Sequence, residues 1–389
     1  MDFQLSEEQL AIRDMVREFA REEIAPNVME FDEKKEFPAH LVPKMGELGL
    51  LGVFIPEEYG GAGMGMVEYA LIIEELSAVD PSIGLTVAAH NSLGTNHIYT
   101  FGNEDQRRKY IPRLARGETL AAWALTEPCC GSDAASLRTT ARREGDRWIL
   151  NGQKTFITNP NYADYTVVMA RTNPEAGKAG ISAFVVEKGT PGFTVGQPMN
   201  KLGCRASDTA ELFFEDCALP AENLLGKEGQ GYFNAMEILA GGRISIAALC
   251  LGMARGAYEH AIRYSEEREA FGKKINEFQL VRNKLVDMAV QIEAGRLMVL
   301  QAAWLKDQGR DVTLKAAMAK MLCSEMAVRI TEQAVQIFGG YGFIKEYPVE
   351  KYYRDVKIGT IGEGTTEILR MLIGHHLIKH LRETGTIPM

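Results

Sequence analysis

The sequence has few of the features that mark secreted, metal-binding or nucleic-acid-binding proteins. Only six of its 389 residues are cysteine and seven are histidine. The cysteines lack paired spacing, and no set of cysteine and histidine has zinc-site spacing, so we expect reduced thiols, a reducing compartment and no metal. The net charge is −9 with Lys and Arg scattered along the chain, which argues against binding to nucleic acid or an anionic membrane.

Signals for export and for nucleotide binding by a Rossmann fold are also missing. The stretch after Met1 has neither a basic region nor an apolar core, and no apolar run is long enough to span a membrane. The expected location is therefore the cytoplasm. No Gly-x-Gly-x-x-Gly opens a helix after a strand, so a Rossmann nucleotide site is not expected.

What the chain does have is enough apolar sequence, 46% of 389 residues, for more than one core. Residues 1–120 have a helical pattern, with Ser6 as a capping residue and helices expected at 67–78 and 83–100. We therefore predict an N-terminal α-helical domain over 1–120.

Residues 121–232 change to the pattern of short strands separated by Gly, Pro, Asn and Asp. Within them, the Asn151-Gly152 pair lies between two apolar runs, which predicts a β-hairpin. The spacing favours an antiparallel barrel or sandwich as a middle domain, rather than βαβ units.

Residues 233–389 return to a helical period, with long helices expected at 243–267, 278–308 and 313–338. Their Ala, Met and Leu content predicts a C-terminal four-helix bundle with more than one buried face. The whole chain is then an α+β multidomain protein with a β domain between two helical ones.

Near the C-terminus, Glu363 lies between Gly362 and Gly364, directly before Thr365 and an apolar helical run. This arrangement places the carboxylate on a loop at a helix N-terminus. A glutamate beside glycines is commonly a solvated loop residue, so its role depends on what the rest of the chain contains.

Three further motifs precede this loop in a fixed order. They are Ala124–Asp133 (ALTEPCCGSD), Glu267–Gly272 (EREAFG) followed by Phe278-Gln279, and the run from Gln336 to Asp355 with its FGGYGF core. Together with the Glu363 loop and Pro56–Gly61 (PEEYGG), they resemble the acyl-CoA dehydrogenase family of flavoenzymes over essentially the whole chain.

The resemblance implies FAD as cofactor, held by three groups of residues. The group expected around the flavin ring is Trp123, Leu125, Thr126, Gly131, Ser132, Phe156, Ile157 and Thr158. The group expected to reach the adenosine and pyrophosphate end from a neighbouring subunit is Arg268, Phe271, Gln279, Gln336, Ile337, Gly339 and Gly340. Thr365 and Glu367 are expected to contact the cofactor from a helix start. A site shared in this way requires a homo-oligomer, and the resemblance favours a tetramer.

The reaction implied is α,β-dehydrogenation of an acyl-CoA to the trans-2-enoyl-CoA. Glu363 removes the α-proton, a β-hydride moves to flavin N5, and an electron-transfer flavoprotein takes the electrons. Because the α-hydrogen of a thioester is a very weak acid, the base must be a desolvated carboxylate with a raised pKa. Ser132, Arg243 and Gly364 are expected to contact the substrate. In isovaleryl-CoA-type relatives the base lies just before the matching Arg, a place that Gly242 leaves empty here.

The acyl group is less well defined than the chemistry. Gly362 stands where many relatives have Tyr, which favours a short or branched chain. A glutaryl-CoA enzyme needs a cation for the distal carboxylate, and no Lys or Arg occurs from 79 to 106. Cyclic or aromatic acyl groups stay open, as does a non-catalytic flavoprotein, although the retained Glu363 argues against the last. Cys130 and Phe156 depart from the residues usual in the family, at positions that the resemblance associates with flavin binding and with docking of the electron acceptor.

Overall fold

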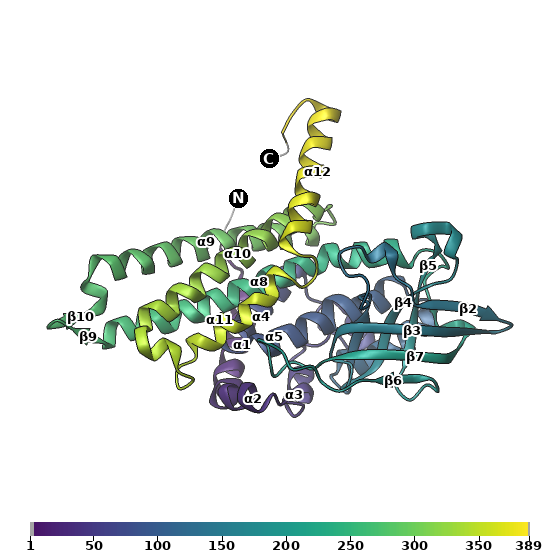
Figure 1. Cartoon of the computed structure of the whole chain (residues 1–389), viewed down its shortest axis with the longest axis horizontal. Helices are drawn as coiled ribbons and strands as arrows, with labels where there is room; N and C mark the ends of the chain where they lie inside the picture. The colour runs from purple at the N-terminus through teal and green to yellow at the C-terminus, as the bar shows by residue number, and fades with distance from the viewer. Residues whose placement is uncertain (1–3, 388–389) are drawn as a thin grey trace.

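The computed structural model describes residues 4–387, and in it a long helical body carries a β domain at one end (Figure 1). The N-terminal helices begin with α1, which Ser6 caps in a reciprocal capping box with Gln9, as the sequence predicts. The helices of this part are α1 (Glu7–Phe19), α2 (Val28–Lys34), α3 (Leu41–Glu47), α4 (Met66–Val79), α5 (Pro81–Ala88), α6 (Asn96–Phe101) and α7 (Glu104–Ala115). A π-helical turn, η4 (Ala89–Thr95), joins α5 to α6, so the helix expected at 83–100 is continuous but changes its winding in the middle.

The middle segment forms one eight-stranded sheet in the order β6-β7-β3-β2-β4-β5-β8, with β1 paired to β4. Its strands are β1 (Leu120–Ala124), β2 (Thr140–Glu144), β3 (Arg147–Thr158), β4 (Ala163–Arg171), β5 (Ile181–Glu187), β6 (Phe193–Val195), β7 (Thr209–Pro220) and β8 (Leu224–Leu225). Most pairs are antiparallel, but β1 runs parallel to β4, and β2 meets β4 only at Thr140 and Arg171. The sheet therefore has two halves that join at a narrow connection.

The hairpin predicted at Asn151-Gly152 is wrong. Both residues lie inside the single strand β3, where the register with β7 shifts between Leu150 and Gly152. Gly152 has a φ of 145°, and a Cβ there would lie 2.6 Å from Thr139 Oγ1, so the glycine forms a bulge against a neighbouring segment. The turn of the hairpin lies earlier, at Gly145-Asp146 between β2 and β3.

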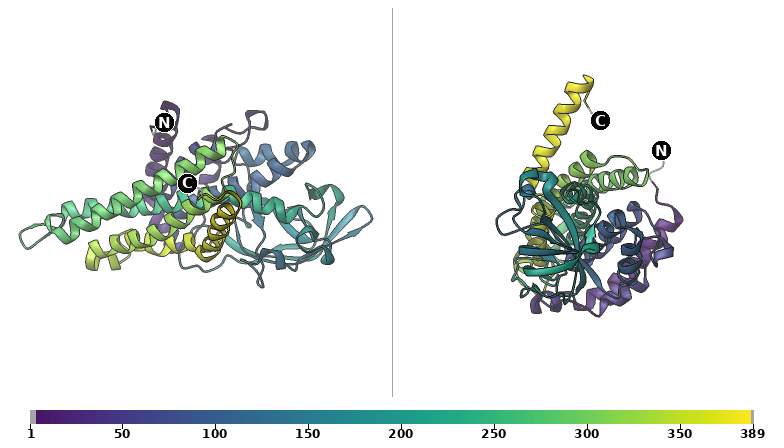
Figure 2. Two further views of the ribbon diagram at one scale, coloured as in Figure 1. Left: turned by 90° about the horizontal axis from the view of Figure 1, so that it is seen from above. Right: turned by 90° about the vertical axis from the view of Figure 1, so that its right-hand side faces the viewer.

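The C-terminal segment is built on three long helices packed side by side. Its elements are α8 (Gly231–Glu267), β9 (Glu269–Ala270), β10 (Lys273–Lys274), α9 (Gln279–Asp307), α10 (Thr313–Phe338), α11 (Val349–Asp355) and α12 (Thr366–Thr384). The first turns of α12 pack on α10 through Leu369, Ile373 and Ala317, and the rest of the helix projects away from the body (Figure 2). α8 begins at Gly231, twelve residues before the predicted start at 243, so Arg243 lies inside the helix instead of at its beginning. We keep 120 and 232 as proposed domain boundaries.

Helix α8 also corrects the expectation that no segment reaches membrane-spanning length. Within residues 4–387 it is the one helix long and apolar enough for that, but 78% of its most apolar window is buried inside the protein. This is the burial of a core helix.

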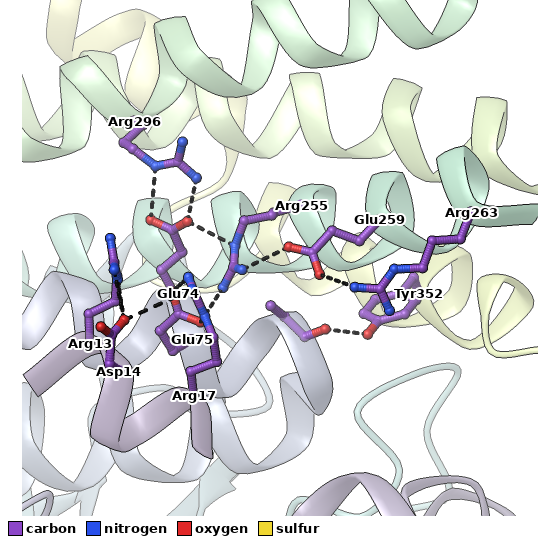
Figure 3. A network of polar contacts seen from close by, with 11 residues as sticks. Arg13, Asp14, Arg17, Glu74, Glu75, Arg255, Glu259, Arg263, Arg296 and Tyr352 are labelled. Carbon is purple, nitrogen blue, oxygen red and sulfur yellow. Dashed lines mark hydrogen bonds and ion pairs between the residues drawn. The ribbon is translucent and has the colours of Figure 1, made fainter. Parts of the chain in front are cut away.

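A network of buried charges joins the N-terminal helices to the long helices (Figure 3). Glu75 on α4 binds Arg17 of α1 at 2.8 Å and Arg255 of α8 at 2.7 Å. Glu74 binds Arg296 of α9 at 2.6 Å. Buried carboxylates of this kind need paired cations, so the network fixes how α1, α4, α8 and α9 sit against one another.

Candidate active site

The Glu363 loop follows the short turn η10 (Val356–Thr360) and has an uncommon backbone conformation. Glu363 has a φ of 51° and Gly364 a φ of 100°, in the left-handed region that few residues other than glycine adopt. Thr365 caps α12 by accepting a hydrogen bond from the Ile368 amide at 3.3 Å. The cap and the positive φ values turn the Glu363 side chain away from solvent and into the body.

The carboxylate of Glu363 is buried without a partner. Within residues 4–387 its Oε2 atom has no hydrogen-bond partner, and its backbone amide donates to no acceptor. Burial raises the pKa of Glu363 to about 7, although the Lys320 and Arg243 cations act in the opposite direction. A group with this pKa exists in substantial part as a desolvated carboxylate at neutral pH.

Gly242 on α8 faces this carboxylate directly. A Cβ at Gly242 would lie 2.3 Å from Glu363 Oε2 and 3.4 Å from Leu93 Cδ2. The position that the isovaleryl-type enzymes use for their base is therefore next to the Glu363 carboxylate in space. The glycine leaves room for a carboxylate that arrives from the other side.

Arg243, the next residue on α8, is 91% buried, with 9% of its surface exposed, and its Nε atom has no partner within residues 4–387. Burial lowers its pKa, and the Glu363 charge partly restores it. The two residues form no ion pair within the described chain, so both retain polar atoms that a bound molecule can satisfy.

Sequence reasoning missed two further residues of this site. Lys320 on α10 is fully buried and donates a hydrogen bond to the Gly364 carbonyl. Tyr69 on α4 is fully buried, donates to Ala88 O at 3.0 Å, and has its pKa raised mainly by burial, with a smaller contribution from Glu363. A lone lysine on the otherwise apolar stripe of Ala316, Cys323 and Ala327 was the available signal for Lys320.

The residues predicted around a flavin ring lie together where β1 and β3 end. The Thr155 amide donates to Thr126 O at 2.9 Å, which ties the two segments together, and Trp123 Nε1 donates to His97 at 2.9 Å. Phe156 is 68% exposed and has a φ of 59°, so its ring stands out from the sheet. The other members of this group are Leu125, Gly131, Ser132, Ile157 and Thr158.

These residues suit a flavin in their chemistry. The backbone at Gly131 is open, since a Cβ there would meet only Thr126 Cγ2 at 3.7 Å, and Ser132 is exposed beside it. Half-buried threonine hydroxyls, an exposed aromatic ring and accessible backbone amides are the donors and apolar surface that a flavin requires.

Next to this surface, Glu127, Cys129 and Cys130 bring three potential metal-ligand atoms within 4.8 Å of one another. The Glu127 carboxylate is already engaged, because it binds Lys154 Nζ at 2.8 Å and accepts from the Thr139 amide at 2.9 Å. Its contacts are those of a structural carboxylate that holds the turn in place.

The second predicted cofactor group lies at the far end of α8 and α10. Arg268, Ile337, Gly339 and Gly340 line a cavity of about 480 Å³ there, with Tyr341 below the Arg268 guanidinium at 5.8 Å. Gln336 is exposed at the end of α10, while Phe271 and Gln279 are exposed at the β9–β10 turn and the start of α9. The open glycines and the arginine suit a phosphate group.

The two cofactor groups are far apart within one chain. The 25 helical residues from Arg243 to Arg268 extend about 38 Å, longer than a dinucleotide. Figure 1 shows the β9–β10 turn at one end of the molecule and the sheet at the other. Glu363, Gly364 and Arg243 lie together, whereas Glu367 is exposed in the first turn of α12.

Comparisons with known proteins agree with this architecture. Residues 6–118, 122–217 and 229–378 match the family models for the acyl-CoA dehydrogenase N-terminal, middle and C-terminal domains. The short-chain-specific acyl-CoA dehydrogenase of Clostridium acetobutylicum is 46% identical over 97% of this chain and 100% of that protein.

Two solved structures are similarly close. A chain from work on the electron transferring flavoprotein of Acidaminococcus fermentans and flavin-based electron bifurcation is 49% identical, with a TM-score of 0.96 over 97% of this chain and 100% of that one. Butyryl-CoA dehydrogenase from Megasphaera elsdenii is 43% identical, with a TM-score of 0.95 over 97% and 100% of the two chains. The chain is therefore a member of the acyl-CoA dehydrogenase family of FAD-dependent oxidoreductases.

Proposed function

We propose that this chain dehydrogenates a short or branched acyl-CoA to the trans-2-enoyl-CoA, with Glu363 as the base that removes the α-proton. The observation that carries the proposal is the buried Oε2 atom of Glu363, which has no partner within residues 4–387 and belongs to a carboxyl with a pKa of about 7. A desolvated carboxylate poised near neutral pH is the base that a weakly acidic C–H group requires.

The residues around Glu363 have complementary tasks. The backbone amide of Glu363 has no acceptor within the described chain, so it is free to donate to the thioester oxygen as negative charge develops there. Arg243 supplies a buried cation beside the same space and balances the charge of the bound substrate. FAD, when bound, would supply the acceptor for the β-hydride. The residues near β1 and β3 of one chain and the Arg268 cavity of another would hold it.

The wall formed by α5, η4 and α6 supports an uncharged acyl group. Leu93 of η4 comes within 3.4 Å of the Gly242 Cβ position, which places this wall beside the base. Between residues 79 and 106 the side chains that could carry a positive charge are His90 and His97. Both are buried, and burial lowers the pKa of His90 to about 4 and that of His97 to about 3. Both are neutral at pH 7, so residues 79–106 offer no cation for a distal carboxylate such as that of glutaryl-CoA.

The proposal includes a homo-oligomer, because one chain holds two separated halves of the cofactor site. The halves require at least a dimer, and the family resemblance favours a tetramer. Exposed apolar side chains follow α9 and the projecting α12 and suit subunit contacts: Val286, Val290, Leu297, Trp304, Met371, Ile378 and Leu381. Light scattering of the yellow protein would give its oligomeric state, and a monomer with tightly bound FAD would contradict a cofactor site shared between subunits.

The acceptor and location complete the proposal. Because a related chain comes from work on an electron transferring flavoprotein, we propose an acceptor of that kind for this enzyme. All six cysteines are free thiols, which suits the cytoplasm.

The decisive experiment is anaerobic titration of the purified flavoprotein with butyryl-, isovaleryl-, octanoyl-, glutaryl- and cyclohexanecarboxyl-CoA. We expect rapid bleaching of the flavin absorption by butyryl- or isovaleryl-CoA and slower bleaching by the others. Faster reduction by octanoyl-CoA would contradict the short-chain assignment, and reduction by none would favour the non-catalytic alternative.

The base is tested by Glu363→Gln, which keeps the shape of the side chain and removes its basicity. We expect this variant to retain its flavin and to lose the rate of flavin reduction by about 10³-fold. A rate near that of the wild type would remove Glu363 from its proposed role.

A further inference from the structure

Three lysines are buried in the described part of the chain, and Lys320 differs from the other two. Lys154 pairs with Glu127 at 2.8 Å, and Lys351 pairs with Asp80 at 2.8 Å and Asp355 at 2.6 Å. Lys320 is 0% exposed, yet no carboxylate within residues 4–387 lies at ion-pair distance from it. A buried ammonium without a paired carboxylate is costly, which calls for a reason why it is present.

The one hydrogen bond that Lys320 makes within residues 4–387 leads to the Glu363 loop. Its Nζ atom, on α10, donates to the carbonyl of Gly364, the residue directly after Glu363. Glu363 has a φ of 51°, so the loop here is held in a left-handed conformation that residues other than glycine seldom adopt. The lysine thus anchors the backbone that carries both the Glu363 carboxylate and its amide.

The charge of Lys320 also acts on the carboxylate itself. Among the charges that favour the ionised form of Glu363, Lys320 has the largest effect and Arg243 the second. Both act across a buried, weakly screened space. Lys320 in turn faces Cys250 of α8, Arg243 and Glu367, and burial lowers its pKa to about 8. Tyr69 from α4 completes the set of ionisable groups around Glu363.

We propose that Lys320 is a positioning residue for the dehydrogenation: its ammonium fixes the Gly364 carbonyl and keeps Glu363 ionised beside the substrate. The inference rests on the proposed role of Glu363 as base. In this proposal Lys320 acts through the loop and through its charge. Without that charge, Glu363 holds its proton to a higher pH and the enzyme loses its base at neutral pH.

The test is the pH dependence of kcat/KM for butyryl-CoA, measured with the FAD-loaded enzyme and its Lys320→Met variant. This parameter reports ionisations of the free enzyme. We expect the acid limb of the Lys320→Met profile to move to higher pH by about one unit, so that its activity at pH 6 falls about tenfold relative to wild type. Above pH 9 Lys320 itself has lost its proton, so its charge no longer separates the two profiles, and the difference that remains there measures the lost hydrogen bond to Gly364.

Matched variants separate charge from structure. Lys315→Met removes a half-buried lysine from the same helix and should leave the midpoint unchanged. Lys320→Arg keeps a cation and should keep the midpoint as well. Lys320→Gln removes the charge but keeps a polar side chain, and it decides the question if the methionine variant does not fold. A Lys320→Met profile lowered equally at every pH, or not lowered, would overturn the inference.

The two variants together distinguish failure of the inference about Lys320 from failure of the proposed function. If Glu363→Gln is inactive while Lys320→Met keeps the wild-type midpoint, only the role of Lys320 is lost. If Glu363→Gln is active, the assignment of the base itself is lost.

Discussion

Two regions of this molecule treat buried charge in opposite ways. At the joint between the helical segments, Lys351 of α11 binds both Asp80 and Asp355, and the acidic residues of α4 bind arginines from three helices (Figure 3). At the catalytic loop, Glu363 has an unpartnered oxygen, Arg243 an unpartnered nitrogen and Lys320 no ion pair within residues 4–387. Both regions are desolvated, so burial alone does not separate them.

From this difference we infer which charges serve the fold and which serve the proposed reaction. Paired charges are complete without a ligand, and their removal leaves a partner stranded. Unpaired buried charges weaken the fold and are retained where a bound molecule or a transition state completes them. The comparison predicts that substitutions at the joint reduce stability, whereas substitutions at the loop reduce activity.

The largest expected effect on stability is that of Lys351→Met. This change leaves two carboxylates, Asp80 and Asp355, buried without their cation. We expect the free energy of unfolding to fall by roughly 3–5 kcal/mol, measured by urea denaturation of the flavoprotein. The control is Lys345→Met, which breaks an exposed pair with Glu33 and should change stability little. Equal losses in the two variants would show that the joint is not held by its buried charges.

The second prediction concerns the pH dependence of stability at the loop. The pKa of Glu363 is about 7 in the folded protein and near the usual 4.5 once unfolded. Between these values the folded state binds more protons than the unfolded one, so stability falls as pH rises through this window. At pH 8 the cost reaches roughly 3 kcal/mol, and below pH 4.5 it vanishes.

Glu363→Gln cannot titrate, so it measures this cost. We expect the variant to gain stability over the wild-type flavoprotein as the pH is raised from 5 to 8, by the same roughly 3 kcal/mol, in denaturation without acyl-CoA. Glu228→Gln, at an exposed position, should give a constant difference from wild type across the range. A constant difference for Glu363→Gln too would mean that the carboxylate is not desolvated in solution.

Much of the fold and the family could be predicted from the sequence, because long motifs in order determine a family and helical periods survive in long helices. The hairpin at Asn151-Gly152 failed for a physical reason. An Asn-Gly pair suits a tight turn or a bulge equally well, and the choice is made by β7, which pairs with β3 on both sides of it. That pairing is a long-range contact that no local pattern contains.

The motif residues of the candidate site could be named from the sequence, but the residues that surround them in space could not. Glu363 and Arg243 belong to recognisable motifs, but the role of Lys320 depends on which carbonyl lies opposite it, 44 residues further along the chain. The start of α8 was missed because residues 226–231 (GKEGQG) lead into it and the Gly241-Gly242 pair interrupts its helical pattern.

The smallest predicted effect is that of one methyl group at Gly242, and it tests whether the loop depends on the space left for its carboxylate. Ala at this position would place its Cβ 2.3 Å from Glu363 Oε2, so the flexible carboxylate must move. We expect flavin reduction by butyryl-CoA to slow about tenfold, because a shifted base loses its alignment with the α-hydrogen. Stability should not fall, since alanine is the better helix former. The control is Gly241→Ala on the same helix, where a Cβ meets nothing closer than 3.9 Å and the rate should stay near that of the wild type. Equal rates in the two variants would mean that the carboxylate is free to act from more than one position, and that the loop is less constrained than its unpaired charges imply.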